Sequence, residues 1–211
     1  MLADLTLGGF ADEVGGPSPA PGGGSVAAYA GSMAASLVGM VCHLTAGKKG
    51  FEAREEELRG AVSQAEELKA RLLAAVDVDT DAYLRVAGAY RLPKTTPDET
   101  AVRAGQIAAA TRAAAEVPLA TAEACLEVLE LARSVSAEFN ASAASDLGVA
   151  FQMALAGMHG AALNVEINLQ HLDVDAGTAA LRQRLAEVTG RAEQVTAEVW
   201  PAVHALVLGS T

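Results

Sequence analysis

The sequence predicts an all-α protein, a bundle of long, closely packed helices, and three observations support this fold class. Apolar residues recur with helical periods along the 211 residues, and no segment shows the sustained alternation of a strand. Hydrophobic residues make up 51% of the chain, but aromatic residues only 4%. Small side chains, mostly alanine, must therefore fill the interior, which favours helices in close contact. Residues 1–211 suit a single domain, because one core is comfortable up to roughly 250 residues.

The first part of the chain predicts a short helix near Leu2–Val14, a loop of proline and glycine over 15–24, and a helix from about Ser25 to Thr45. Ser25 is a suitable N-cap for this last helix. Small residues fall every four positions along it, at Ala27, Gly31, Ala35 and Gly39. One ridge therefore carries almost no side chain, so another helix can approach closely. We expect this helix at the centre of the bundle.

A long helix is expected from Glu52 to about Tyr90, after a glycine stop and a basic last turn at 47–50. Its apolar stripe runs through Leu58, Val62, Ala65, Leu72, Val76, Tyr83, Val86 and Tyr90. Asp79 stands on this stripe, where the pattern calls for an apolar residue. A carboxylate there must be paired or have a raised pKa, and both are common at functional sites. Asp77 and Asp81 point roughly 200° away, so we interpret them as solvated acids.

Proline and capping signals place the remaining helices. Leu92-Pro93 ends the previous helix, and Thr96-Pro97-Asp98-Glu99 begins the next with an N-cap, a proline and early acids. This helix is expected to bend near Pro118 and to end at about Ser134. The following helix is expected to end at about Leu172. Asp175 is the expected N-cap of the last helix, which bends near Pro201.

The loop Pro21-Gly22-Gly23-Gly24-Ser25 needs a special explanation, because each glycine loses more backbone entropy on folding than other residues do. One explanation is close approach to a ligand, since N–H groups before a helix face an anion or a carbonyl favourably. The other is a tight turn into a crowded helix pair. The loop is not a P-loop, because Gly-Lys-Ser/Thr does not follow.

Asp146 and Asn164 are 18 residues apart, which is five helical turns, so they point the same way. Asn168 follows one turn later. On a straight helix that separation is roughly 27 Å. Asp146 and Asn164 then share one small site only if the helix breaks near Gly157 and Gly160 or a second subunit completes the pocket. The alternative for the two asparagines is hydrogen bonding between helices.

Charge and cysteine usage narrow the classes of function. The net charge is −11, and no basic run occurs, which argues against a nucleic-acid partner. Cys42 and Cys125 lie in apolar helical stretches, as expected of core residues in a reducing cytoplasm. Residues 1–10 do not resemble a signal peptide. The uncharged run Val26–Cys42 is shorter than the roughly 20 residues of a spanning helix, so we expect no membrane association.

The histidines His43, His159, His171 and His204 have no metal-ligand spacing, and we interpret them as structural. Nothing in the sequence requires a metal or an organic cofactor.

Several motifs in order resemble the cyclodeaminase/cyclohydrolase family of one-carbon folate enzymes. They are residues 21–28, Thr45-Ala46-Gly47-Lys48-Lys49, Val76-Asp77-Val78-Asp79 with Ala82-Tyr83, residues 91–97, Arg103, Pro118-Leu119, Asn140, Ser145-Asp146-Leu147 and Asn164 to Leu169. Together they are far more specific than any one of them. The resemblance covers roughly Phe10 to Asp173, and the last helix carries little of it. Asp81 departs from the family pattern, so we leave it out of the site.

The resemblance implies an all-helical dimer that acts on tetrahydrofolate derivatives. One family reaction hydrolyses 5,10-methenyltetrahydrofolate to 10-formyltetrahydrofolate. The other closes 5-formiminotetrahydrofolate to the methenyl form and releases ammonia. Both pass through a tetrahedral carbon bonded to two nitrogens. The hydrolysis is our first hypothesis and the cyclodeaminase reaction the second; a non-catalytic helical module that binds folate or dimerises is an alternative of another class.

The catalytic candidates are Asp79 and Asp146, because a cationic amidinium carbon is stabilised by a carboxylate and its attack by water needs a base. Cations would bind the anionic glutamate tail, including a polyglutamate tail, and the glycine loop would supply N–H groups. The expected substrate-binding residues are Gly22, Gly23, Gly24, Ser25, Lys48, Lys49, Tyr83, Lys94, Arg103, Asn140, Asn164 and Asn168.

Overall fold

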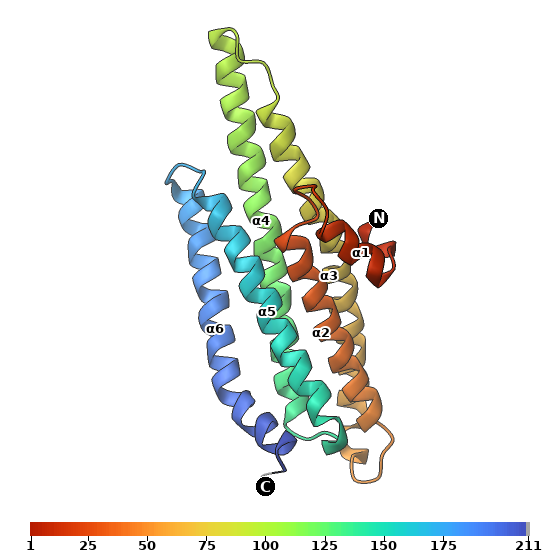
Figure 1. The fold of residues 1–211 in the computed structure, drawn as a ribbon. Helices are drawn as coiled ribbons and strands as arrows, with labels where there is room; N and C mark the ends of the chain where they lie inside the picture. Colours follow the sequence, from red (N-terminus) through yellow and green to blue (C-terminus); the bar gives the residue numbers. More distant parts are fainter. Residues whose placement is uncertain (210–211) are drawn as a thin grey trace.

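The computed structural model describes residues 1–209, and within this range the secondary structure is helical, with no strand (Figure 1). The elements are η1 (Leu2–Asp4), α1 (Leu7–Val14), α2 (Gly23–Thr45), η2 (Glu52–Arg54), α3 (Glu55–Tyr90), α4 (Pro97–Ser136), η3 (Ala141–Ala143), α5 (Ala144–Leu169) and α6 (Ala176–Val207). The long helices α2 to α6 lie alongside one another, and the α3–α4 hairpin extends beyond the rest of the bundle. The predicted all-α fold of closely packed long helices is confirmed.

Helix α2 packs against α3, α4 and α5, as its ridge of small residues predicted. Two glycines show why small residues are needed there. A Cβ on Gly31 would lie 2.6 Å from the sulfur of Cys125, and a Cβ on Gly157 in α5 would lie 2.8 Å from the carbonyl oxygen of Ala27. Contacts this short are not tolerated in a packed interior. Cys42 and Cys125 are both buried and free, as expected of core residues.

Helix α2 is longer than its uncharged core suggested. At 23 residues it is long and apolar enough to cross a membrane by length and composition alone, so the shortness of the uncharged run does not argue against a spanning helix. Its packing supports the interpretation as a bundle helix, because 61% of its most apolar window is buried against other helices.

The caps of the later helices agree with their sequence signals. Thr96 and Asp175 form capping boxes with Glu99 and Thr178, respectively. The predicted N-cap at Ser25 is wrong: α2 begins at Gly23 with Gly22 as its N-cap, and no side chain caps it.

Pro118 lies inside α4, which continues unbroken to Ser136. A proline has no N–H, so the carbonyl of Ala114, four residues earlier, loses its helical donor. The side-chain Nδ2 of Asn168 donates to this carbonyl at 2.9 Å. Asn168 thus joins α5 to α4 at the proline. This contact agrees with the alternative stated for the two asparagines, in which they form hydrogen bonds between helices.

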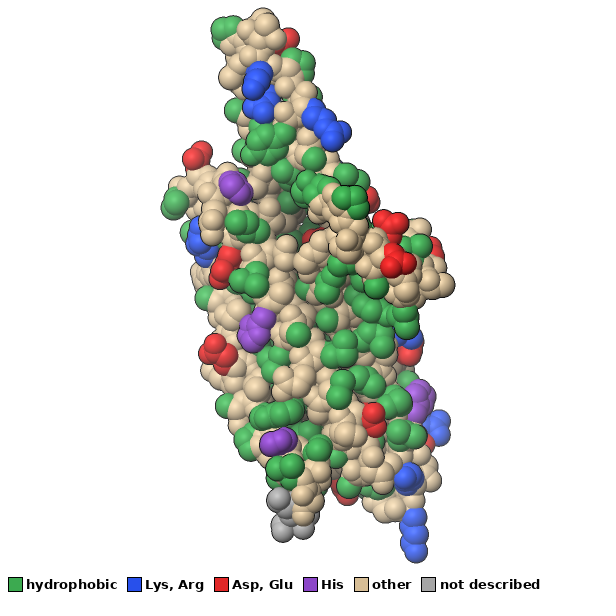
Figure 2. All heavy atoms as spheres, viewed as in Figure 1, with side chains coloured by type: hydrophobic (Ala, Val, Ile, Leu, Met, Phe, Trp, Pro, Cys, Tyr) green, Lys and Arg blue, Asp and Glu red, His purple; other side chains and the backbone are tan. Residues whose placement is uncertain are grey.

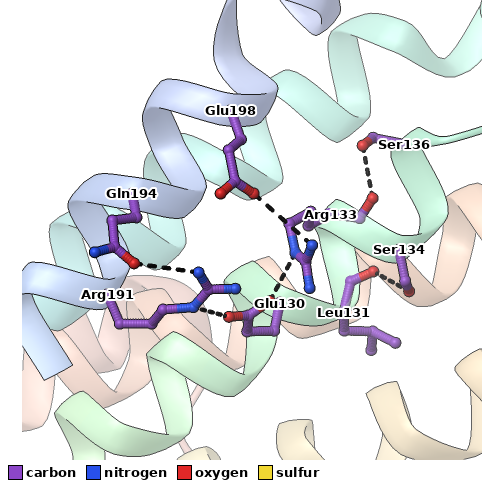
Figure 3. A network of polar contacts seen from close by, with 8 residues as sticks. All are labelled: Glu130, Leu131, Arg133, Ser134, Ser136, Arg191, Gln194 and Glu198. Atoms are coloured by element: carbon purple, nitrogen blue, oxygen red, sulfur yellow. Dashed lines mark hydrogen bonds and ion pairs between the residues drawn. The ribbon is translucent and has the colours of Figure 1, made fainter. Parts of the chain in front are cut away.

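Helix α6 is held to α4 by apolar contacts and by a network of charged groups (Figure 3). Arg191 Nε donates to Glu130 Oε1 at 2.5 Å, and Arg133 Nε donates to Glu130 Oε2 at 2.8 Å. Glu198 lies 3.8 Å from Arg133. These side chains are partly exposed, so they contribute modestly to stability and chiefly set the position of α6.

The position of Asp77 on the helix predicted a solvated acid, but its carboxylate also forms hydrogen bonds within the protein. Its Oδ1 accepts from the backbone N–H of Leu2 at 2.6 Å, and its Oδ2 lies 3.4 Å from the backbone nitrogen of Ala3. Asp77 therefore fixes the first residues of the chain to α3. The segment predicted as one short helix, 2–14, consists of η1 and α1, with Thr6 as the N-cap of α1.

Candidate active site

The glycine loop leads directly into the N-terminus of α2, where it meets Asp79 of α3. A Cβ on Gly24 would lie 2.1 Å from Asp79 Oδ1, 2.5 Å from its Cγ and 2.7 Å from its Oδ2. Only glycine leaves room for this carboxylate. The third glycine is therefore explained by the close approach of α2 to α3, which agrees with the alternative of a crowded helix pair.

Ser25 holds the Asp79 carboxylate in place. The Ser25 hydroxyl lies 3.0 Å from Asp79 Oδ2 and 2.9 Å from the carbonyl oxygen of Val76, within donating distance of both. Thr80 Oγ1 is 3.3 Å from the same hydroxyl. Ser25 is fully buried, so its hydroxyl supports Asp79 and does not reach a substrate directly.

Burial raises the pKa of Asp79 above its ordinary value, and hydrogen bonds from the Ser25 hydroxyl and backbone lower the pKa by a smaller amount. The carboxylate also lies at the positive end of α2, which favours its charged form. The result is a partly buried carboxylate that is a stronger base than a solvated one.

A cavity of about 310 Å³ opens beside Asp79. Its walls come from the glycine loop, α3, α4 and α5. The lining residues with polar or backbone groups for a ligand are Gly22, Gly23, Gly24, Asp79, Tyr83, Asn164, Asn168 and His171. Val86, Ile167 and Ala82 add apolar surface. This combination suits a flat, polar ring with an apolar face.

The two asparagines have their amide nitrogens engaged. Asn168 Nδ2 donates to Ala114 O and to Asn164 O, while Asn164 Nδ2 donates to Gly160 O at 2.8 Å. Their side-chain oxygens are therefore the groups best suited to accept from a ligand in the cavity.

The structure separates a second group of expected site residues from this cavity. Helix α5 is continuous through Gly157 and Gly160, so Asp146 lies five turns, roughly 27 Å, from Asn164. The possibility of a break in α5 is thereby excluded. Asn140 lies near Asp146, and its Nδ2 donates to Leu44 O at the end of α2.

The cations also lie away from the cavity. Lys48 and Lys49 are exposed in the turn after α2, at the Asn140 end of the bundle. Lys94 and Arg103 lie near the tip of the α3–α4 hairpin, where Figure 2 shows a group of basic side chains. Arg103 donates to the carbonyl of Tyr90 at 3.0 Å and lies 5.5 Å from the centre of its ring. Asp146 and these cations therefore do not line the cavity beside Asp79 in a single chain.

His171 is a lining residue that the sequence interpretation missed. It was classed with the structural histidines because it has no metal-ligand spacing. The signal that points to the cavity is its position three residues after Asn168, which places the two on the same helical side as α5 ends.

A larger hollow of about 610 Å³ lies between α5 and α6. Met153, Trp200 and Val203 are among its mostly apolar lining residues, His204 is its one lining group within residues 1–209 that can act as a base, and none of these described lining residues is a carboxylate. It therefore offers no negative side chain to stabilise a cationic substrate, and the smaller cavity is the better candidate for this chemistry.

Comparison with known proteins agrees with this architecture. A family profile described as formiminotransferase-cyclodeaminase matches residues 6–187. A methenyltetrahydrofolate cyclohydrolase from Methylorubrum extorquens is 41% identical over 190 residues, which are 90% of this chain and 90% of that protein. The formimidoyltransferase-cyclodeaminase of Rattus norvegicus is 34% identical over 99% of this chain, which corresponds to 37% of that protein.

A solved structure gives the same result for the fold. The crystal structure of formiminotetrahydrofolate cyclodeaminase from Thermotoga maritima matches with a TM-score of 0.89 at 26% identity, over 98% of this chain and 100% of that one. The motifs, the helical architecture and these similarities agree, and the chain belongs to the formiminotransferase-cyclodeaminase family.

Proposed function

We propose that this protein hydrolyses 5,10-methenyltetrahydrofolate to 10-formyltetrahydrofolate. The observation that carries the proposal is Asp79, a supported and partly buried carboxylate at the wall of a cavity of about 310 Å³. The choice of reaction is supported by the cyclohydrolase from M. extorquens, which is 41% identical over nearly its whole length.

The reaction consumes one water and releases one proton. The methenyl carbon of the substrate is an amidinium cation, bonded to N5 and N10. Water adds to this carbon and loses a proton, which gives a neutral tetrahedral carbon. The bond from carbon to N5 then breaks, N5 takes up a proton from the hydroxyl group, and the formyl group stays on N10.

Asp79 has two functions in this proposal. Its negative charge stabilises the substrate cation, and its raised pKa makes it a better proton acceptor for the attacking water. The oxygens of Asn164 and Asn168 and the N–H groups of the glycine loop orient the ring system. Tyr83 provides an aromatic surface at the mouth of the cavity.

The anionic tail of the folate is proposed to bind to cations outside the cavity. Lys94 lies in the turn between α3 and α4, and Arg103 lies in α4 between this turn and the lining residue Ala114; Lys48 and Lys49 are the other candidates. We also propose that the protein works as a homodimer in the cytoplasm, without a resident metal or cofactor. The two free, buried cysteines support a reducing compartment.

The cyclodeaminase reaction is the second candidate. It is favoured by the rat relative and by the structural similarity to the T. maritima cyclodeaminase. N10 takes the place of water as the nucleophile, and ammonia leaves from the same tetrahedral carbon. A base at the position of Asp79 serves either reaction.

A spectrophotometric assay with purified protein distinguishes these possibilities, because only the methenyl form carries the chromophore. Loss of the signal from methenyltetrahydrofolate, faster than in buffer, is the expected result. Gain of the signal from 5-formiminotetrahydrofolate would assign the cyclodeaminase reaction instead. If neither reaction is accelerated, the enzyme proposal is wrong and a non-catalytic folate-binding module becomes the better interpretation.

A further inference from the structure

The orientation of the Asn168 amide group is determined by its two hydrogen-bond partners. Its Nδ2 donates to Ala114 O of α4 at 2.9 Å and to Asn164 O of its own helix at 2.8 Å. Both partners are carbonyl oxygens, which only accept, so the amide nitrogen and not the amide oxygen must face them. The nitrogen carries two N–H groups, and both are used. The remaining polar atom, Oδ1, is therefore left as an acceptor.

Pro118 makes one of these partners available. In a regular helix the N–H at position 118 would donate to the carbonyl of Ala114, four residues earlier. Proline has no N–H, and its ring pushes against that carbonyl. Ala114 is buried, so its carbonyl oxygen needs another donor, and Asn168 of neighbouring α5 supplies it. A missing N–H in α4 thus holds a side chain of α5 in one orientation.

This side chain belongs to the wall of the cavity beside Asp79. Ala114 and Asn168 both line the cavity, whereas Pro118 is buried and is not a lining residue. A change at Pro118 therefore reaches a ligand through its neighbours and not by direct contact.

A second acceptor lies one turn earlier on α5. Asn164 Nδ2 donates to Gly160 O at 2.8 Å, so the Asn164 amide is also oriented by a carbonyl. Asn164 and Asn168 lie roughly 6 Å apart along the helix axis, and both line the cavity. This wall therefore presents side-chain oxygens to a ligand. A ring edge that carries N–H groups is complementary to it, because each oxygen then gains a donor.

We infer that Pro118 is a positioning residue for the substrate: by freeing Ala114 O it fixes Asn168 Oδ1 as an acceptor for the pterin ring. The pyrimidine ring of the pterin carries a 2-amino group next to a ring N–H, and this donor edge matches the α5 wall. The site thereby selects a 2-amino pterin over a ring without the amino donor, which would leave an oxygen unpaired. The inference rests on the proposed function, because it takes a reduced pterin as the ligand.

Equilibrium binding, measured by isothermal titration calorimetry, tests this selectivity. The probes are 5-formyltetrahydrofolate, a stable reduced folate, and its analogue with a methyl group in place of the 2-amino group. The wild type is expected to bind the amino form about tenfold more tightly or better. In Pro118→Ala the new N–H competes for Ala114 O, so Asn168 can turn, and the preference is expected to fall about threefold or more. Asn168→Ala should lose at least as much, because Oδ1 is removed.

Steady-state kinetics separate the positioning of the substrate from the chemistry and from stability. Pro118→Ala should raise the KM for methenyltetrahydrofolate about threefold or more and keep kcat within about twofold, because Asp79 is not moved. The double variant Pro118→Ala/Asn168→Ala should regain thermal stability relative to Asn168→Ala, since Ala114 O again has a donor. Its KM should stay raised, because the acceptor is still missing. If Asn168 were only a structural link, stability and KM would recover together.

Pro201→Ala is the matched control for the loss of a proline from a helix. Pro201 lies inside α6, and it does not line the cavity. This variant should keep the wild-type KM and the wild-type preference for the amino probe. A changed preference in Pro201→Ala would mean that the selectivity does not depend on the contact between Pro118, Ala114 and Asn168.

An unchanged preference in Pro118→Ala and Asn168→Ala, with helical circular dichroism intact, would overturn the inference. An equal loss of affinity for both probes would also overturn it, because a general distortion of the cavity weakens both alike. Failure of the proposed function gives a different result: the wild type binds the amino probe selectively but accelerates neither folate reaction. A wild type that binds neither probe would contradict the inference and the proposed function together.

Discussion

Replacement of Gly24 by alanine tests the central contact of the site, because the added methyl group meets the Asp79 carboxylate. Its Cβ would lie 2.1 Å from Oδ1 and 2.5 Å from Cγ of Asp79, far inside van der Waals contact. The carboxylate must therefore move away from Ser25, or α2 must shift relative to α3. Either movement displaces the proposed base.

The magnitude follows from two opposing effects. Overpacking typically costs about 1–3 kcal/mol. Replacement of glycine by alanine in a helix returns about 0.4–1 kcal/mol. We expect a net loss of about 1–2 kcal/mol in the free energy of unfolding, and a melting temperature lower by roughly 2–8 °C for a chain of this length. Turnover should fall at least tenfold, which corresponds to about 1.4 kcal/mol in the activation free energy.

Two glycines provide matched controls for this substitution. A Cβ on Gly23 would lie 3.4 Å from Asn164 Nδ2, and a Cβ on Gly60 of α3 would meet nothing within 4 Å. Gly23→Ala should keep the wild-type melting temperature within about 2 °C, and Gly60→Ala should raise it. Turnover is measured from the methenyl chromophore and stability by thermal denaturation. Wild-type turnover and stability in Gly24→Ala would refute the reasoning about Asp79.

Three further predictions concern the charge of Asp79, the proline in α4 and the folate tail. Asp79→Asn should lower turnover at least tenfold with an unchanged helical circular dichroism spectrum. Burial raises the pKa of Asp79 in the folded protein above its ordinary value of 3.8. The wild type should therefore lose stability relative to Asp79→Asn as the pH rises from about 3.8 through the pKa of the folded protein. Parallel profiles of melting temperature between pH 3.5 and 7 for the two proteins would contradict the raised pKa. Asn168→Ala should lower the free energy of unfolding by about 1–3 kcal/mol, because Ala114 O loses its donor. Pro118→Ala in the Asn168→Ala background should recover part of that loss, because it restores an N–H to the helix. A double-mutant cycle measured by urea denaturation tests this, and strictly additive changes would exclude a coupling between Asn168 and Pro118. Lys94→Ala should raise the KM for polyglutamylated methenyltetrahydrofolate more than for the monoglutamate, and an equal change in both would remove Lys94 from tail binding.

The sequence predicted most helix boundaries correctly, because their signals are local. Thr96 and Asp175 bind backbone N–H groups within three residues of themselves, so the capping pattern is visible in the chain. Ser25 failed as an N-cap for the opposite reason. Its hydroxyl is engaged by Val76 and Asp79, more than 50 residues away, and no local pattern contains that contact.

The candidate site was predictable only in part. Asp79 was found because an acid on an apolar stripe violates the helical pattern, and the structure places it in the cavity with the glycine loop and both asparagines. Asn140 and the lysines were assigned to the site from the resemblance to a family, which identifies residues without placing them. Asp146 was noted from its helical spacing to Asn164, and that spacing gives a direction but does not bring the two residues together. His171 was missed because it breaks no pattern.

By itself, the sequence determined the helical fold, the central position of α2 and the inward direction of Asp79, since helical periodicity and small-residue spacing are properties of neighbouring positions. Only the tertiary structure decided that Gly24 makes room for a carboxylate, that Asn168 satisfies the carbonyl freed by Pro118, and that α5 separates Asp146 from Asp79. These facts depend on the distances between helices, and such distances are set by side chains that meet across the bundle.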